Sequence, residues 1–81
     1  MTSVILSEEA EKDYNRLPRP QQGKIIRKLK ILGENPLSGK LLGRELKGFR
    51  VSRAWPYRIL YEFFKSRIVV HRILHRQGAY K

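Results

Sequence analysis

The spacing of apolar residues changes its period partway along this chain of 81 residues. Between residues 8 and 34 apolar side chains recur at helical spacing, whereas from Phe49 onward they alternate with polar ones. The segment between these regions, residues 36–43, is rich in Gly, Ser, Pro and Lys and is typical of a loop. The sequence therefore predicts a pair of helices followed by a sheet, in a chain long enough for one small domain.

The helical half opens with a short apolar run, Val4–Leu6, which predicts a strand leading into the first helix. Ser7 suits the N-cap position, and the two glutamates after it favour a helix start. This helix should end near Arg16, because the proline that follows disfavours the helical conformation in the residue before it. A second helix is predicted from about Pro20 to Glu34, with Ile25, Leu29 and Leu32 on one face and Ile26 beside them.

The alternating half predicts three sequential antiparallel strands, at Phe49–Arg53, Tyr57–Phe64 and Ile68–Leu74. Turns are expected at residues 54–56, where Trp55 should pack into the core, and at residues 65–67. The opening strand is expected to join the edge of the sheet. The predicted fold is thus α+β in the order β-α-α-β-β-β, a small antiparallel sheet packed on an N-terminal helix hairpin.

Strand alternation also divides the side chains between two faces of the sheet. The set predicted to face the helices is Phe49, Val51, Tyr57, Ile59, Tyr61, Phe63, Val69, His71 and Ile73. The set predicted to face outward is Arg50, Ser52, Arg58, Val70, Arg72, Leu74 and Arg76. Because like charges on one face repel each other, four arginines there predict a surface that binds phosphate. The alternative is that each arginine is an ordinary exposed residue, with Glu62 as a cross-strand partner.

The charge of the chain supports an anionic partner. Lys and Arg number 18 against 7 Asp and Glu, which gives a formal net charge of +11. Residues 35–81 alone contain eleven basic and two acidic side chains, a net charge of +9. The sheet-forming half therefore carries most of the positive charge.

Composition also bears on cofactors and location. The chain has no cysteine, and its two histidines lack a nearby carboxylate cluster, so we expect no metal and no other cofactor. No apolar stretch approaches the ~18 residues that would predict a membrane span, and the N-terminus does not resemble a secretion signal. The expected location is the cytoplasm.

Cleavage of RNA is one chemistry that this set of residues allows. The ribose 2′-hydroxyl attacks the adjacent phosphate, so a protein has to align it, stabilise charge and move protons. Arginine suits the phosphate but cannot transfer protons, because its pKa lies above about 12. An imidazole side chain can both give and accept a proton, so His75 is the natural proton carrier, unless it simply ends a strand. Tyr80 can stack on a base, or instead cover the edge of the core.

Several motifs make the resemblance to a known family specific. They are the strand and helix start that ends in Ser7–Ala10, the segment Leu46–Arg50, the strand Tyr57–Tyr61, and the ending His75-Arg76 with Tyr80. On these residues the chain resembles toxins of the RelE/ParE superfamily of type II toxin–antitoxin modules over nearly its whole length. The resemblance implies a compact sheet packed on a helix hairpin.

The resemblance also implies an activity. Toxins of the RelE branch enter the ribosomal A site and cleave translated mRNA there, without a metal. By analogy Arg58 would bind phosphate, Arg76 would stabilise the transition state, and Tyr80 would orient a base. Where such enzymes often have two alternating lysines, this chain has Arg50 and Ser52.

That difference leaves the general base open. His75 is the preferred candidate and Lys47 the second, because Arg50 keeps the charge of a lysine but cannot act as a base. The catalytic set is therefore Arg50, Arg58, His75, Arg76 and Tyr80. Lys47, Ser52, Arg53 and Arg72 are expected to contact RNA.

The partners implied by the resemblance are the ribosome with its mRNA, and an antitoxin that offers an acidic amphipathic helix. No membrane and no small-molecule cofactor is expected. Two other functions remain open on the sequence. One is a ParE-like toxin that inhibits DNA gyrase by binding, and the other is a small RNA-binding module without catalysis.

Overall fold

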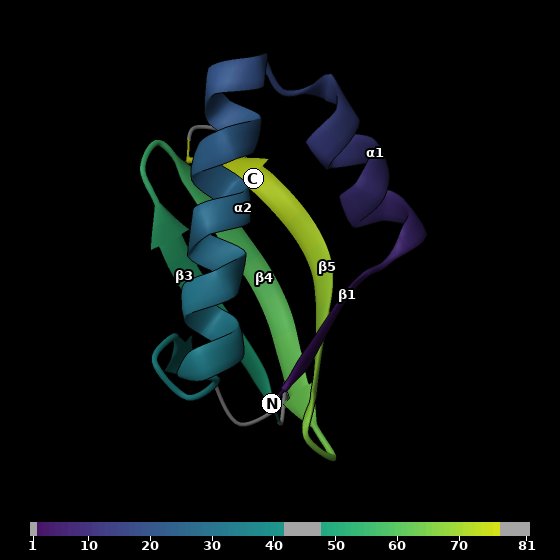
Figure 1. The fold of residues 1–81 in the computed structure, drawn as a ribbon, viewed down its shortest axis with the longest axis vertical. Coiled ribbons are helices and arrows are strands. Elements are labelled where there is room, and N and C mark those ends of the chain that lie inside the picture. The colour runs from purple at the N-terminus through teal and green to yellow at the C-terminus, as the bar shows by residue number, and fades with distance from the viewer. Residues whose placement is uncertain (1, 42–47, 77–81) are drawn as a thin grey trace.

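A five-stranded sheet and two helices make up the protein, whose computed structural model describes residues 2–41 and 48–76 (Figure 1). The elements are β1 (Ser3–Leu6), α1 (Glu8–Arg16), α2 (Arg19–Glu34), β2 (Lys40–Leu41), β3 (Phe49–Ala54), β4 (Tyr57–Phe64) and β5 (Arg67–His75). Their order across the sheet is β1-β5-β4-β3-β2. The predicted helix pair, the three sequential strands and the edge position of the first strand are confirmed.

Two features of the sheet differ from the prediction. β1 runs parallel to β5, so the sheet is mixed rather than wholly antiparallel. β2 lies within the segment predicted to be a loop, and its two residues pair with β3. A two-residue strand such as β2 is too short to show an alternating pattern in the sequence. The pairing of β1 with β5 joins residues far apart in the chain, which the local spacing of apolar residues does not encode.

The helix ends follow from local chemistry. Ser7 begins α1, because its hydroxyl accepts a hydrogen bond from the Ala10 N–H at 3.1 Å. The same hydroxyl donates to the His71 carbonyl at 3.0 Å, which fastens the helix start to β5. α2 has Pro20 in its first turn, a position that tolerates a missing N–H, and ends before an Asn-Pro pair.

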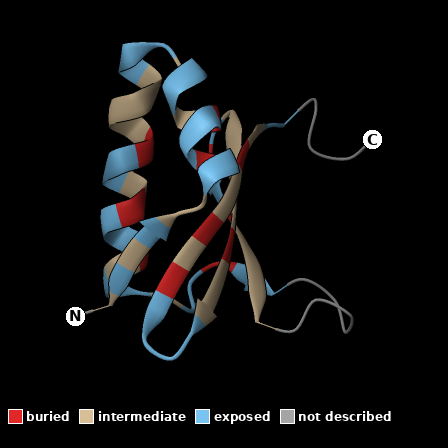
Figure 2. Ribbon diagram, turned by 90° about the vertical axis from the view of Figure 1, so that its right-hand side faces the viewer, coloured by how far each residue is buried: buried red, intermediate tan, exposed pale blue. Residues whose placement is uncertain are grey.

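The core lies between α2 and the sheet, with α1 lying along β5 (Figure 1). Figure 2 shows the buried residues of α2 on the side of the helix that faces the sheet. The buried apolar residues are Ala10, Ile25, Leu29, Leu32, Ala54, Ile59, Tyr61, Ile68, Val70 and Ile73. Burial of these side chains is the main source of stability in a domain of this size. Within the described residues no helix is both long and apolar enough to span a membrane.

The predicted faces are correct for β4 and reversed for β3. Ser52 and Ala54 are only 5% and 7% exposed, and Ser52 lies directly opposite the buried Ile59. Since directly opposite residues share a face, Arg50, Ser52 and Ala54 point toward the helix side, and Phe49 points away from it. The small side chains of Ser52 and Ala54 suit a strand that α2 contacts closely.

The predicted faces of β5 are wrong before a β-bulge and right after it. Val70 is fully buried opposite Tyr61, whereas Val69 lies opposite Glu62 on the outer face. Val70 pairs with Tyr61 and Ile73 pairs with Ile59, so two residues of β5 lie opposite one residue of β4. His71 lies in this irregular stretch. The additional residue reverses which side chains of β5 face the helices. The sequence does not show this reversal, because apolar residues occupy both faces of the strand.

Both hairpin turns contain two residues. Lys65 and Ser66 adopt positive φ angles of 50° and 59°, as a tight turn between β4 and β5 requires. Trp55 and Pro56 connect β3 to β4 through a cis peptide bond. Trp55 is 63% exposed, so the prediction that it packs into the core is wrong.

Candidate nucleic-acid interface

The end of the sheet at the β3–β4 turn brings three arginines together. Arg53 in β3 lies directly opposite Arg58 in β4, and Arg58 lies opposite Leu74 in β5. Arg76 follows the end of β5, where its N–H donates to the Pro56 carbonyl at 2.8 Å. The outward positions predicted for Arg58 and Arg76 thus converge on one end of the sheet, and Arg53 joins them.

The positive charge at this end is available to an anion. Within residues 2–41 and 48–76, no ion pair involves Arg53 or Arg76, and both side chains are exposed. Arg58 is half-buried. Guanidinium groups can present paired N–H donors to phosphate, so this end of the sheet has the chemistry of a phosphate-binding surface.

An aromatic side chain accompanies these arginines. The Arg76 guanidinium lies over the Trp55 ring, with 4.5 Å between the guanidinium carbon and the ring centroid. On the other side of the turn, the Lys24 ammonium from α2 donates to the Trp55 carbonyl at 2.7 Å. The sequence-based site omitted Trp55, although a tryptophan beside a turn proline and among arginines was a signal that could have included it.

His75 lies at the same end of the sheet but on the other face. It is opposite Tyr57, and the two rings meet edge to face with their centroids 5.4 Å apart. Tyr57 packs against the core, so His75 alternates toward the helix side, whereas Arg58 and Leu74 lie on the outer face. His75 is exposed and adjoins Arg76 in the chain.

Arg50 does not share the face of Arg58, so the prediction of a single surface containing both is wrong. Its Nη1 donates to the carbonyls of Leu37 and Gly39 at 3.2 and 2.9 Å. The guanidinium thus fastens the loop between α2 and β2 to the sheet. Ser52, predicted to contact RNA, is buried beneath the helix side of β3.

Tyr61 holds the same loop from within the core. Its hydroxyl donates to the Pro36 carbonyl at 2.7 Å and accepts from the Gly39 N–H at 3.0 Å. Burial raises the pKa of the Tyr61 phenol above its ordinary value, although the Gly39 N–H and the charge of Arg50 act in the opposite direction. A Cβ at position 39 would lie 2.5 Å from the Tyr61 hydroxyl, so only glycine fits there.

Arg72 forms a structural ion pair that joins β5 to α1. Its Nε and Nη2 donate to the carboxylate of Asp13 in α1 at 2.7 and 3.1 Å, and the Ile73 N–H donates to the same carboxylate at 3.0 Å. Burial alone would raise the pKa of Asp13, but the hydrogen bonds from Arg72 and Ile73, with the charges of Arg72 and Arg16, lower it. The bond to Asp13 correspondingly raises the pKa of Arg72. Sequence reasoning missed this pairing, since no local pattern links α1 to β5.

Glu62 and His71 form a second polar group on the outer face. His71 Nε2 lies 3.2 Å from Glu62 Oε1, and the ring of Phe49 stacks on the imidazole at 4.9 Å between centroids. Among the described residues Glu62 therefore pairs with His71 rather than with Arg58 or Arg72. Lys47 and Tyr80, both predicted site residues, lie outside the described residues. Across residues 2–41 and 48–76, no group of three or more His, Cys, Asp and Glu side chains is arranged to hold a metal ion.

Comparisons with solved structures place this fold among small toxins. A chain of the RelBE2 toxin–antitoxin complex from Mycobacterium tuberculosis superposes with a TM-score of 0.84 at 30% identity, over 93% of this chain and 98% of that one. The isolated RelE toxin of E. coli gives 0.79 at 20% identity, over 93% and 84% of the two chains. A chain of the E. coli DinJ–YafQ complex gives 0.81 at 16% identity, over the full length of both. The last two likenesses are of fold alone.

These findings define the class of the protein as a toxin of a type II toxin–antitoxin module within the RelE/ParE superfamily. Residues 4–80 match the model of the family described as the ParE toxin of the type II toxin–antitoxin system parDE, and the chain belongs to that family. A search of curated proteins found no significant match to the sequence.

Proposed function

We propose that this toxin is an endoribonuclease that cleaves translated mRNA in the ribosomal A site. The observation that carries the proposal is the convergence of Arg58 and Arg76 at one end of the sheet, with Arg53 opposite Arg58. Arg58 and Arg76 both belong to motifs that resemble those of the RelE branch. The net charge of +9 in residues 35–81 supports an RNA partner.

The reaction is an attack of the ribose 2′-hydroxyl on the adjacent phosphorus, which breaks the bond to the next nucleotide's 5′ oxygen. Negative charge grows on the phosphate during this step, and guanidinium groups placed beside it stabilise that charge. Arg58 binds the phosphate in the ground state and Arg76 stabilises the transition state. Alignment of the attacking hydroxyl by the ribosome and the protein together supplies a large part of the rate.

Proton transfer falls to residues other than arginine. In this proposal proton exchange with the reacting oxygens is assigned to His75, which is exposed and adjoins Arg76 at the end of β5 although it lies on the helix side of the sheet. Lys47 is the second candidate, and Tyr80 orients a base. Because Arg50 and Arg72 are held by the loop carbonyls and by Asp13, their contributions act through the fold rather than through contact with the scissile phosphate. Ser52 has no direct role because it is buried.

The proposal includes an antitoxin as the controlling partner. The similar chains from M. tuberculosis and from the DinJ–YafQ pair come from toxin–antitoxin complexes. A segment with an acidic amphipathic helix would complement the basic sheet and compete with RNA for it.

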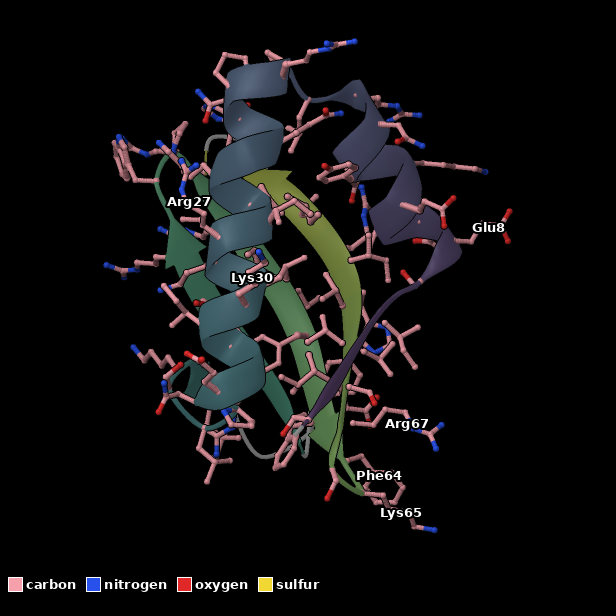
Figure 3. All side chains as sticks on the ribbon, in the orientation of Figure 1. Glu8, Arg27, Lys30, Phe64, Lys65 and Arg67 are labelled. Atoms are coloured by element: carbon pink, nitrogen blue, oxygen red, sulfur yellow. The ribbon has the colours of Figure 1, made fainter. Side chains whose placement is uncertain are left out.

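The test is to map the 5′ ends of mRNA in a translating extract to which the purified toxin is added. We expect cuts positioned by codon, and we expect Arg58→Ala and Arg76→Ala each to lower their rate by about 100-fold or more. Arg67→Ala is the matched control, because Arg67 is an exposed arginine at the opposite end of β5 (Figure 3). Equal losses in all three variants, or intact mRNA with the wild type, would refute the proposal. Equal cleavage of free RNA would refute its ribosome dependence.

Inhibition of DNA gyrase by binding is the second candidate. It is favoured by the match to a ParE family model and by the absence of the lysine pair, whose positions hold Arg50 and the buried Ser52. A supercoiling assay beside the mRNA assay separates the two functions. Inhibited supercoiling with intact mRNA would select this candidate.

A further inference from the structure

Trp55 is an exposed aromatic residue at the arginine-rich end of the sheet. It is the only tryptophan of the chain, and 63% of its surface is exposed even though Arg76 lies over its ring. Exposure of a large apolar side chain costs free energy, and a single exposed residue of this kind can be incidental. Its neighbours indicate otherwise.

Two cations contact Trp55, one at its backbone and one at its ring. Lys24 in α2 donates to the backbone carbonyl of Trp55 at 2.7 Å, and the Arg76 guanidinium covers the ring at 4.5 Å from its centroid. An aromatic ring has two faces, so one face is covered by a cation while the large exposed fraction leaves the other accessible. Because Lys24 anchors the backbone and Arg76 already covers one face of the ring, the indole loses less conformational entropy when a flat ligand stacks on it.

The charge around the indole selects the kind of ligand. Arg53, Arg58 and Arg76 surround the turn, and within the described residues no ion pair neutralises Arg53 or Arg76. A flat, apolar surface edged with guanidinium groups matches a nucleotide, whose base stacks on an aromatic ring while its phosphate binds arginine. An acidic peptide would satisfy the arginines but has no need of an exposed indole face.

We propose that Trp55 is a stacking platform for an unpaired base of single-stranded RNA, with Arg53 and Arg76 binding the phosphates beside that base. This inference rests on the proposed function and adds a base-binding position next to the phosphate site. A paired base is stacked on both faces within a helix, so the platform selects single strands over duplexes. It binds any base, because every base has a flat face.

The single tryptophan makes the contact directly measurable. The probe is a 2′-O-methyl oligoadenylate of about eight nucleotides, which can bind but cannot be cut because its 2′ oxygen is blocked. Stacking of adenine on the indole quenches its fluorescence. Inorganic polyphosphate of equal charge binds the arginines without supplying bases, and we expect it to leave most of the fluorescence in place.

Anisotropy of the same oligonucleotide, labelled at one end, measures affinity in variants. Trp55→Ala is expected to weaken binding about 5- to 100-fold, and Trp55→Phe should retain most of the affinity. Phe64→Ala is the matched control, because Phe64 is 62% exposed and carries Lys65 over its ring at 5.3 Å, at the opposite end of the sheet (Figure 3). That variant should bind as the wild type does.

Three results would overturn the inference. They are equal quenching by polyphosphate, unchanged affinity in Trp55→Ala, and an equal loss in Phe64→Ala. If Trp55→Ala weakens binding of an acidic antitoxin helix and leaves oligonucleotide binding intact, the indole belongs to a protein interface instead. Because the probe cannot be cut, stacking can be confirmed or rejected whether or not the mRNA assay detects cleavage.

Discussion

Arg50 shows how one side chain can have the charge of a catalytic residue and the contacts of a structural one. Its motif predicts a place beside the phosphate, yet its guanidinium donates to two carbonyls of the loop between α2 and β2. The Tyr61 hydroxyl fastens the same loop through Pro36 and Gly39. Removal of Arg50 would therefore disturb the fold first.

Arg50→Ala is expected to lower the free energy of unfolding by about 1–2 kcal/mol, because the Leu37 and Gly39 carbonyls lose a charged donor. Arg53→Ala, at an exposed position three residues further along β3 on the other face, should change it by less than about 0.5 kcal/mol. Urea unfolding followed by circular dichroism measures both. Equal stabilities of the two variants would show that the Arg50 hydrogen bonds contribute nothing to folding.

Sequence reasoning at this scale succeeded for residues whose neighbours in the chain decide their role. Ser7 was identified as a helix cap because the cap acts on a residue three positions later. Arg50 and Trp55 were misjudged because their surroundings come from other elements, the α2–β2 loop and the end of β5. Strand alternation alone gives two possible faces, and only the partner strands decide between them.

At the scale of elements, Asp13 couples α1 to the edge of β5. β1 covers that edge only as far as Val70, and beyond it the Asp13 carboxylate accepts the Ile73 N–H that a further strand residue would otherwise bind. Arg72 neutralises the carboxylate at the same place. Asp13 is 8% exposed, so its charge depends on these partners.

Asp13→Asn is expected to lower the free energy of unfolding at pH 7 by about 1–3 kcal/mol, since Arg72 loses its charged acceptor. The pKa of Asp13 is lower in the folded protein, so its contribution is complete above the unfolded value near 4 and is lost as pH falls through the native value. Unfolding curves between pH 7 and pH 2 should therefore converge for the variant and the wild type in acid. The exposed Glu8, changed to Gln, is the control and should leave the profile unchanged. A constant difference at every pH would contradict the pKa assignment.

The order of the elements was largely predictable from the sequence, and the pairing of the strands was only partly so. Proline residues and a good N-cap marked the helix ends, and two short turns marked the hairpins. The bulge in β5 left no trace, because apolar residues occupy both faces of Ile68–Leu74. The parallel contact of β1 with β5 joins residues more than sixty positions apart, beyond the reach of local spacing.

The whole molecule carries a net charge of +11. Within the described residues the pairs of opposite formal charge are Lys12–Glu8 and Arg72–Asp13, and Glu62 contacts the imidazole of His71. Mutual repulsion among the remaining cations favours expansion of the chain, and an anionic partner relieves it. Folding and RNA binding should therefore respond to salt in opposite directions.

Added sodium chloride is expected to raise the melting temperature of the free protein, because it screens repulsion among the cations. The same salt should weaken binding of single-stranded RNA, with a linear fall of log affinity against log salt concentration. Thermal unfolding and anisotropy titrations measure the two effects. Arg53→Ala should reduce the slope of the binding plot by about 1. A melting temperature that falls with salt would show that attractive ion pairs dominate instead.

The place of β5 in the sheet has a genetic consequence. β5 lies between β1 and β4, so it joins the first strand of the chain to the hairpins that follow the helices. An mRNA with a stop codon just before codon 67 would encode both helices, Arg53 and Arg58, but no strand to join β1 to the rest of the sheet. In such a fragment β1 would have no partner strand, so the sheet could not form as a whole. A nonsense mutation anywhere upstream of codon 67 would therefore abolish the activity of the toxin rather than leave a partly active fragment.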